Sequence, residues 1–410
     1  MKIRILHQFF HPDLSSTSQV LSQVAFHLAE RGDQVSVICS RNRYDRIRHV
    51  PLPMRETVRG VEIHRCWGPS LDRHSLVGRG MNVAAYAVLA AARALLSKKA
   101  DVVLFMTDPP FFPLLGAALK FLRGEKIVYI LMDLYPEVAF RAGALREGSA
   151  AGRALRRLAR GALRAADAVV VLGEDMREAV LRAGADARRV AIIPNWADPE
   201  AIRPVFHGEN PFRKGLGLDG KFVVAYSGNF GVSHDFSDLL AIAAEWSSDP
   251  DIRFLLIGGG ARREEVENAA KGLSNVLLLP YQEGSMLSET LSAGDVHFVS
   301  LRPGFEGLVV PSKAYGIMAA GRPILYQGSP RGEIARMVAR EEIGAVVLPG
   351  DRERLREAIL QFKSNPARRA QAGEAARKAL LERYSAKTGL SRYRETIHAA
   401  AGIRGASTES

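Results

Sequence analysis

The stretch KIRILHQFFHPDLSSTSQVLSQVAFHLAERGDQVSVICS, residues 2–40, decides the fold class of this 410-residue chain. It begins with a short apolar run over 2–10 and continues through a loop rich in hydroxyl residues. An amphipathic segment over 20–32 closes on Gly32, and a second apolar run occupies 33–40. Strand, polar loop, helix and strand in this order make up a βαβ unit, whose two strands are parallel.

The same alternation continues through the first half of the chain, and it predicts a doubly wound parallel sheet. Further strands are expected over 101–106, 125–133, 167–173 and 189–195. Helices are expected over 80–97, 111–122, 150–165 and 174–183.

A change of composition separates the two halves of the chain. Residues 195–220 are rich in Pro, Gly and polar side chains, which is typical of an interdomain linker. Beyond them the alternation restarts, with strands expected over 221–228, 252–260, 276–281, 295–301 and 323–328. Helices are expected over 235–246, 262–271, 284–293, 312–320, 351–361 and 366–382. We therefore predict an α/β chain of two tandem Rossmann-like domains that face each other across a cleft.

The domain boundaries follow from the same pattern. We place the first domain at 1–195 and the second at 196–385. A last helix over 386–400 precedes a polar tail, 401–410, that we expect to be flexible.

The composition narrows the class of protein. Cys39 and Cys66 are the two cysteines, which argues against a disulfide scaffold and favours a reducing compartment. The amino terminus lacks the features of a signal peptide. The most apolar region, 80–134, is interrupted by charges and prolines, so no clean run of about 20 residues spans a bilayer. We expect a soluble, cytoplasmic protein.

The net charge of +12 leaves nucleic acid, an anionic membrane and a phosphorylated substrate as partners to consider. Five arginines recur at helical spacing with apolar residues between them: Arg153, Arg156, Arg157, Arg160 and Arg164. Two interpretations stay open, a solvated helix face and a contact with an anionic membrane surface. No interleaved aromatics and no zinc or RNA motif support nucleic acid, so we predict no such partner.

Two glycine-rich turns follow strands of the second half. In AYSGNFGVSHD, Gly228 and Gly231 allow a close approach of backbone, and the next helix start offers free N–H groups to a phosphate. In LIGGGARREEV, Gly258 and Gly259 would let a flat base or sugar lie against bare backbone. For both turns the alternative is a tight turn without a ligand.

A third candidate is VVPSKAYGIMAAGRPI, residues 309–324, where Pro311, Ser312 and Lys313 stand at a helix start. A lysine there opposes the helix dipole and is unfavourable for the helix alone. It becomes favourable when an anion such as a diphosphate occupies the helix mouth and accepts from Lys313, Ser312 and the free N–H groups. The alternative is a lysine that faces solvent.

In the first half, polar residues gather on loops that follow strands. The candidates near the amino terminus are His11, Ser15, Ser16 and Thr17. Asp133 and Glu137 follow a later strand in ILMDLYPEV, with a cap or a buried hydrogen-bond partner as the alternative role of Asp133. No histidine and carboxylate cluster has the spacing of metal ligands, so we predict no metal.

Together these motifs resemble the GT-B glycosyltransferases of family 4, in particular the colanic-acid and O-antigen branch. The resemblance covers nearly the whole chain and is carried by HQFFHPD, DLYPE, IPNWAD, YSGNFG, LPYQ and VPSKAYGIMAAGRPIL in this order. It implies a nucleotide sugar bound mainly by the second domain, an acceptor held by the first, and a last helix that crosses back to the first domain. It also implies transfer with retention of anomeric configuration and without a metal or other cofactor.

The chain departs from the family pattern at four positions. Many members carry an arginine and a lysine after the first strand of the second domain, where Asn229 and His234 stand here. The family's paired glutamates would fall on Leu308 and Gly316. For Gly316 the simple explanation is close packing against the preceding strand.

Two interpretations of these departures stay open. Charge neutralisation moves to Lys313, with Arg302 or Arg322 as lesser candidates, and the carboxylate role moves to Glu306 or Glu333. Otherwise donor binding is impaired and the chain is not a working enzyme. We favour relocation.

The resemblance then assigns roles to this chain's own residues. The expected donor-binding set is Gly228, Asn229, Gly231, Gly258, Gly259, Tyr281, Glu306, Pro311, Ser312, Lys313 and Glu333. We expect Lys313 to stabilise the leaving diphosphate, and Asp133 or Glu137 to orient or deprotonate the acceptor hydroxyl. The acceptor would meet Asp133 and the hydroxyl-rich loop of His11, Ser15, Ser16 and Thr17.

The predicted function is glycosyl transfer from a UDP- or GDP-sugar to a glycan acceptor, which we expect to be lipid-linked, in surface polysaccharide biosynthesis. The alternatives are a non-catalytic sugar-nucleotide-binding protein and a sugar-nucleotide 2-epimerase. UDP against GDP, the sugar and the linkage stay open. The predicted location is the cytoplasm, with a peripheral contact to the inner face of the plasma membrane as an open addition.

Overall fold

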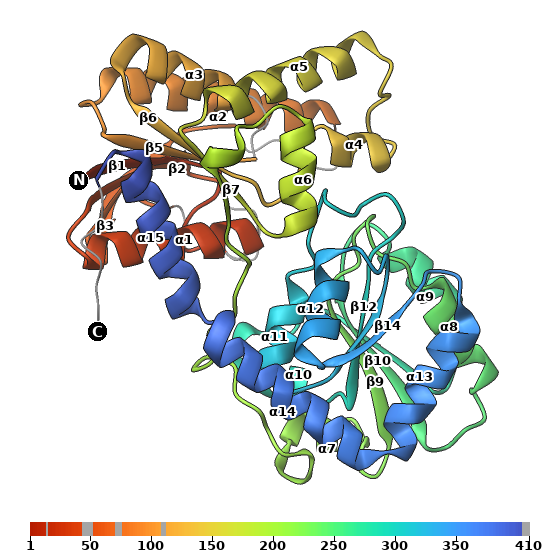
Figure 1. The fold of residues 1–410 in the computed structure, drawn as a ribbon. Helices are drawn as coiled ribbons and strands as arrows, with labels where there is room; N and C mark the ends of the chain where they lie inside the picture. The colour runs from red at the N-terminus through yellow and green to blue at the C-terminus, as the bar shows by residue number, and fades with distance from the viewer. Residues whose placement is uncertain (14, 43–51, 70–75, 108–111, 404–410) are drawn as a thin grey trace. The chain divides into compact units, whose positions relative to one another are not determined.

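The computed structural model describes residues 1–13, 15–42, 52–69, 76–107 and 112–403. Residues 404–410 of the tail predicted to be flexible therefore lie outside the described residues. The chain divides into two compact units (Figure 1). Unit 1 is Met1–Ile193 with Leu390–Ser410, and unit 2 is Pro194–Gly389. Each contains a mainly parallel sheet with helices between most successive strands, which confirms the predicted α/β class.

The sheet of unit 1 has the strand order β3-β4-β2-β1-β5-β6-β7-β8. Its strands are β1 Lys2–Leu6, β2 Gln34–Ser40, β3 Arg55–Val58, β4 Val61–Cys66, β5 Val102–Met106, β6 Lys126–Ile130, β7 Ala168–Val171 and β8 Val190–Ile192. The central strands β1, β5 and β7 are almost wholly buried, as expected for parallel strands covered on both faces. The order reverses at β1, so loops from neighbouring strands meet at its carboxyl end.

The antiparallel hairpin β3–β4 is a feature that the periodicity did not predict. Val58 pairs with Val61, and the two residues between them, Arg59 and Gly60, have φ of 47° and 78°. Two positive φ values in a two-residue loop define the turn that suits a twisted hairpin. Because β3 lies at the sheet edge and alternates polar residues, it has no long apolar run to reveal it.

The helices of unit 1 are α1 Ser16–Glu30, α2 Leu76–Leu96, α3 Phe112–Arg123, α4 Glu137–Arg141, α5 Ala150–Ala165, α6 Glu174–Arg182 and α15 Ala386–Ala400. α2, α3 and α5 lie on one face of the sheet, with α1 and α15 on the other (Figure 1). The last turns of α15 bind unit 1 through His398, whose Nε2 lies 2.9 Å from a carboxylate oxygen of Asp33. Asp33 also accepts from the amino group of Met1 at 3.1 Å. The last helix therefore ties the carboxyl-terminal segment to the first strand.

The sheet of unit 2 has the order β11-β10-β9-β12-β13-β14, and all its pairs are parallel. Its strands are β9 Phe222–Asn229, β10 Ile252–Gly259, β11 Val276–Leu279, β12 Val296–Ser300, β13 Ile324–Gln327 and β14 Gly344–Val347. The order reverses between β9 and β12, because β10 follows on one side and β13 on the other. The carboxyl ends of these strands are where an open α/β sheet binds ligands.

The helices of unit 2 are α7 Pro211–Gly215, α8 Ser237–Glu245, α9 Arg263–Ala270, α10 Leu287–Ser292, α11 Lys313–Ala319, α12 Glu333–Glu341, α13 Arg352–Ser364 and α14 Pro366–Arg383. The predicted linker over 195–220 proves to be part of this unit. Within it Arg213 is buried and donates to Asp295 at 3.2 Å and to the Ala293 carbonyl at 2.6 Å. The polar composition had concealed this packing, since a buried arginine on a carboxylate cannot be told from an exposed one by sequence.

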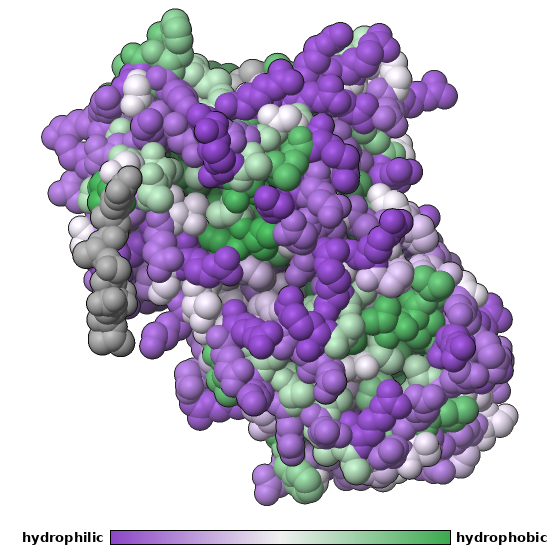
Figure 2. Space-filling model, in the orientation of Figure 1, coloured by the Kyte–Doolittle hydropathy of each residue, from purple (hydrophilic) through white to green (hydrophobic). Residues whose placement is uncertain are grey.

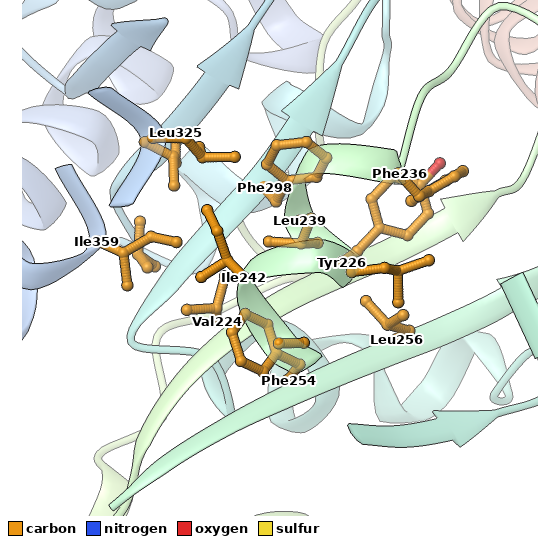
Figure 3. Close-up of a cluster of buried hydrophobic side chains, with 14 of the residues drawn as sticks. Val224, Tyr226, Phe236, Leu239, Ile242, Phe254, Leu256, Phe298, Leu325 and Ile359 are labelled. Carbon is orange, nitrogen blue, oxygen red and sulfur yellow. The ribbon is translucent and has the colours of Figure 1, made fainter. Parts of the chain in front are cut away.

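A large apolar cluster holds unit 2 together between the sheet and helices α8 and α13 (Figure 3). Val224, Phe254 and Phe298 contribute from three strands and are fully buried. Each such side chain contributes about 1.5–3 kcal/mol of burial free energy. Tyr226 belongs to this cluster, with its hydroxyl at the cluster's edge (Figure 3). The apolar core therefore positions one polar atom at the carboxyl end of β9.

Candidate functional site

Bare backbone forms the floor of the candidate site, at the carboxyl ends of β9 and β10. Gly228 and Gly258 are paired in register, with φ of 138° and 143°. A Cβ on Gly258 would lie 1.9 Å from the Gly228 carbonyl oxygen, and one on Gly260 would lie 2.1 Å from Oδ1 of Asn229. These contacts exclude any side chain, so glycine is required here for packing as well as for backbone conformation.

Lys313, the first residue of α11, lies across this floor. A Cβ on Gly228 would stand 3.2 Å from Cε of Lys313. The ammonium donates to the Tyr226 hydroxyl, lies 3.0 Å from Nε2 of His234, and stands 4.0 Å from the centroid of the Tyr226 ring. The lysine at the helix start is therefore turned over the strand end and half-buried, and the alternative of a lysine that faces solvent is wrong.

The hydrogen bonds around Lys313 fix the direction of each proton. Nδ1 of His234 lies 2.6 Å from the Ser300 carbonyl oxygen, which can only accept, so Nδ1 carries the proton and Nε2 accepts from Lys313. The Tyr226 hydroxyl donates to the Asn229 carbonyl at 2.6 Å and accepts from Lys313. Two of the three N–H groups of Lys313 thus donate to neutral acceptors.

The electrostatics of this cluster favour an added anion. Burial lowers the pKa of Lys313 well below its ordinary value. Burial, and then the charge of Lys313, lower the pKa of His234 to about 3, so His234 is neutral at physiological pH. Among the described residues no carboxylate forms an ion pair with Lys313. A phosphate placed here would supply the missing countercharge and accept the remaining N–H.

Other residues predicted to bind the nucleotide-sugar donor lie next to Lys313, Tyr226 and His234. The amide of Asn229 folds back so that Nδ2 would be 3.1 Å from a Cβ on Gly231. The Tyr281 hydroxyl donates to the Gly259 carbonyl at 3.1 Å, and the residue is 60% exposed. An exposed aromatic ring beside bare backbone offers a stacking surface to a base or a sugar. Ser312 is exposed at the N-cap of α11 and makes no capping hydrogen bond there, and Pro311 is buried.

The two carboxylates predicted to replace the absent glutamates, Glu306 and Glu333, make local hydrogen bonds or ion pairs. Glu306 accepts from the Gly304 amide at 2.7 Å, in the loop after β12. Glu333, the first residue of α12, lies 3.3 Å from Nη2 of Arg336. Among the described residues neither pairs with Lys313. Their assignment to the donor stays a prediction.

The two arginines named as lesser phosphate contacts are also engaged elsewhere. Arg302 donates to the Val232 carbonyl at 3.1 Å. Arg322 donates to the Val205 carbonyl at 2.8 Å, and burial lowers its pKa to about 10.

The positions of the absent glutamates differ in environment. Leu308 is a buried apolar residue. A Cβ on Gly316 would meet only side chains, Leu291 Cδ1 at 3.4 Å and Ile202 Cδ1 at 3.9 Å, which are ordinary van der Waals contacts. The explanation of Gly316 by close packing against the preceding strand is therefore wrong, and nothing in the structure requires glycine at this position.

The predicted acceptor residues lie in unit 1 at the carboxyl ends of β1 and β6. His11 packs edge-on against Phe26 at 5.5 Å between ring centroids, and burial lowers its pKa. Ser15 is the N-cap of α1, which begins with Ser16 and Thr17.

Asp133 and Glu137 follow β6. Asp133 is half-buried, and Glu137 begins α4. Glu137 pairs with Arg156 of α5 at 3.0 Å, and Arg156 also holds Glu147 at 2.8 Å. Glu137 therefore joins α4 to α5, and the acceptor-side roles of Asp133 and Glu137 stay predictions.

Tyr226 and His234 are the site residues that the sequence did not identify. Tyr226 stands two residues before Gly228 on the same strand, and its phenol is the one polar group of an aromatic cluster with Phe230 and Phe236 at 5.2 and 4.8 Å. His234 drew notice only as a departure from a charged position. A signal was present, because a tyrosine and a histidine flank a glycine-rich turn in AYSGNFGVSHD.

The described residues contain no group of three His, Cys, Asp or Glu side chains arranged to hold a metal ion. Nor do they include a helix both long and apolar enough to cross a membrane.

The two parallel-sheet units define a class of protein, the glycosyltransferases with two Rossmann-like domains. Comparisons with known proteins agree. Residues 17–196 match the family "Glycosyl transferase 4-like domain", and residues 209–379 match "Glycosyl transferases group 1". The chain is 32% identical to the probable glycosyltransferase WbjE of Pseudomonas aeruginosa over 69% of this chain and 71% of that protein.

The chain belongs to the GT-B glycosyltransferases of family 4. It is also 24% identical to WcaI of Escherichia coli, a putative colanic acid biosynthesis glycosyl transferase, over 78% of this chain and 82% of that protein. Among solved structures it is similar in fold to HepE of Anabaena in complex with UDP, with a TM-score of 0.71 at 18% identity, 97% of this chain and all of the other being covered. The recognition of the family from its motifs is thus confirmed.

Proposed function

We propose that this glycosyltransferase binds a nucleoside diphosphate sugar at the carboxyl ends of β9 and β10, with its diphosphate on Lys313. One observation carries the proposal: a half-buried ammonium is held in place by two neutral acceptors, His234 Nε2 and the Tyr226 hydroxyl. A desolvated charge without a countercharge is costly to the apo protein, and this geometry is explained if an anion completes it. The ammonium is thereby preorganised, so it needs no reorientation when the donor binds.

We assign UDP as the first donor to test. Support comes from HepE, which has been solved with UDP and with UDP-glucose on the same fold. The exposed ring of Tyr281 beside Gly259 is the candidate stacking surface for the base.

For the reaction we propose transfer with retention of configuration, in which positively charged and N–H groups of the protein stabilise the negative charge of the leaving diphosphate. Lys313 and the backbone N–H groups at the start of α11 would stabilise the charge that develops as the sugar bond breaks. Because His234 is neutral and accepts from Lys313, it orients the ammonium without competing for the phosphate. The leaving phosphate takes the acceptor proton, and Asp133 orients the acceptor hydroxyl. No metal is required in this scheme.

The acceptor we propose is a lipid-linked glycan at the cytoplasmic face of the membrane, in surface polysaccharide biosynthesis. WcaI supports the pathway class, since its name assigns it to colanic acid biosynthesis. The hydroxyl-rich loop at the start of α1 is the candidate contact with the glycan.

The proposed donor site is tested by measuring the binding of UDP and UDP-sugars to the purified chain with thermal shift and calorimetry. Release of UDP that depends on a glycan acceptor establishes transfer. UDP binding without release under any acceptor would instead support a non-catalytic sugar-nucleotide-binding protein, the alternative that the absent acids at Leu308 and Gly316 favour. Conversion of the donor into its isomer without an acceptor would indicate a 2-epimerase.

A further inference from the structure

An apolar surface on unit 1 has no role in the donor site. Of the 17 large apolar side chains that are exposed among the described residues, seven lie on α2 and α3. They are Met81, Val88, Leu89, Leu95, Leu96, Phe121 and Leu122. Phe121 and Leu96 are 89% and 88% exposed. Figure 2 shows apolar surface at the upper edge of the molecule, over α3.

Helix α2 is apolar on its outer side as well as on its inner side. Tyr86, Ala90 and Ala94 face the sheet and are buried. The exposed stripe on the opposite side runs through Met81, Ala84, Val88, Ala92 and Leu95. A helix that is apolar all round normally has a second apolar partner, because a surface helix of a globular protein turns polar residues to water.

The carboxyl ends of α2 and α3 join into one patch. Arg123 at the end of α3 donates to the carbonyls of Ala94, Leu95 and Ser97 at the end of α2, at 2.9, 2.7 and 2.8 Å. These bonds hold the end of α3 against the end of α2, where Leu95, Leu96, Phe121 and Leu122 are exposed. We call these four residues the apolar tip.

Cations lie next to the apolar tip. Lys98 and Lys99 follow α2 and are exposed, and within the described residues neither has an ion-pair partner. Of the nearby acids Asp101, Glu125 and Asp167, Asp101 is exposed, and its carboxylate accepts from the Lys2 amide at 2.7 Å. Asp167 is held by Lys120 at 2.9 Å and Lys126 at 3.4 Å, and Glu125 is fully buried.

The next helix in the layer adds a row of arginines. α5 packs beside α3, and its exposed residues include Arg153, Arg157, Arg160 and Arg164, at positions that share one helix face. Arg156 is not part of this row, because Glu137 and Glu147 hold it. Helices that cover one face of a sheet turn their outer sides in the same direction. The apolar stripe of α2, the apolar tip and the arginine row therefore belong to one surface.

We propose that this surface docks on an anionic lipid bilayer, with the apolar tip inserted at the headgroup boundary and the arginine row on the phosphates. Apolar side chains beside unpaired cations match the two layers of such an interface, a hydrocarbon edge and a plane of negative charge. A second copy of this chain would be a poor occupant, because two copies of the same arginine row would repel each other. The proposal extends the acceptor part of the proposed function, since it places the enzyme where a lipid-linked glycan lies, but binding to lipid needs neither donor nor acceptor.

Co-sedimentation of the full chain with vesicles tests the proposal. Phosphatidylcholine vesicles are compared with vesicles that contain phosphatidylglycerol in addition. We expect the parent to bind the anionic vesicles. The double variant Leu96→Ser/Phe121→Ser should bind them about tenfold more weakly. Phe206→Ser in unit 2, where the phenylalanine is 73% exposed, is the matched control and should bind as the parent does.

The charge part has its own pair of variants. Arg157→Gln/Arg160→Gln should weaken binding by about fivefold for each arginine. The control, Arg203→Gln/Arg354→Gln, removes two exposed arginines of unit 2 and should leave binding unchanged.

Three results would overturn the proposal. They are no binding to anionic vesicles, equal binding by the apolar-tip variant, and a dimer in sedimentation velocity that Leu96→Ser/Phe121→Ser dissociates. Thermal shift by UDP is measured on the same variants without lipid. It should equal that of the parent, so failure of the donor site is recognised separately from failure of the docking surface.

Discussion

The sharpest test of the donor site is Lys313→Met, which removes the charge and keeps the length of the side chain. A charge-assisted hydrogen bond is worth about 1.5–3 kcal/mol. Lys313 has one N–H left for a phosphate and adds Coulomb attraction in a partly desolvated place, so we expect the loss to reach about 2.7 kcal/mol. That corresponds to about 100-fold weaker binding of UDP.

The variant should affect the apo protein much less. It leaves Nε2 of His234 and the Tyr226 hydroxyl oxygen without their donor, which costs about 1–3 kcal/mol for each group that stays dry. It also removes a desolvated ammonium without a countercharge, which returns several kcal/mol. These opposing terms nearly cancel, so the unfolding temperature without ligand should change by only a few degrees.

Thermal shift separates the two effects. At a UDP concentration of 100 times the parent's Kd, binding stabilises the parent by about 2.7 kcal/mol and a 100-fold weaker variant by about 0.4 kcal/mol. For a unit of this size that is a shift of roughly 5–11 °C against less than about 2 °C. Lys214→Met, an exposed lysine of the same unit, should keep the full shift. A full UDP shift in Lys313→Met would refute the assignment of the diphosphate to this lysine.

Three further predictions concern the same unit. Gly316→Ala should raise the free energy of unfolding by about 0.5–1 kcal/mol, because the helix gains an alanine whose Cβ makes ordinary van der Waals contacts. Gly258→Ala should unfold the site or prevent folding, since its Cβ would lie 1.9 Å from a carbonyl oxygen. Urea titrations of both variants check this pair, and equal destabilisation would contradict it. The pKa of His234 is lowered to about 3 and that of His297 to about 4, so the unfolded chain binds more protons than the folded one below pH 6.5. The free energy of unfolding should therefore fall with acidification by up to about 1.4 kcal/mol per pH unit for each histidine, most steeply between pH 6 and 4. Urea midpoints that stay constant over that range would be inconsistent with two buried neutral histidines. Because its pKa is lowered, Lys313 loses its proton at a lower pH than an ordinary lysine, so UDP affinity should fall as the pH rises and UDP binding should take up protons. Calorimetry in buffers of different ionisation enthalpy measures this proton uptake. Binding without proton uptake as the pH approaches the lowered pKa would argue against a desolvated ammonium.

The sequence by itself determined the repeated alternation of strand and helix, and with it the two parallel sheets. This was possible because apolar periodicity is local, and a βαβ unit can be read within 40 residues. The glycines at the ends of β9 and β10 were also visible, since Gly228 and Gly258 follow apolar runs. The hairpin β3–β4 was missed because an edge strand needs no apolar run. The span 195–220 was misread as a linker because its polar residues conceal Arg213, a buried arginine.

Only the tertiary structure decided what surrounds Lys313. Tyr226 and His234 precede it by 87 and 79 residues, and no periodicity relates them. They meet it because β9 and β12 are neighbours in the sheet, which brings the turn after β9 and the helix after β12 to the same edge. The same packing sets the charge balance of the site, since the pKa of a lysine depends on the water and charges that the folded chain leaves around it. The sequence identified the lysine, and the order of the strands placed two neutral acceptors around it.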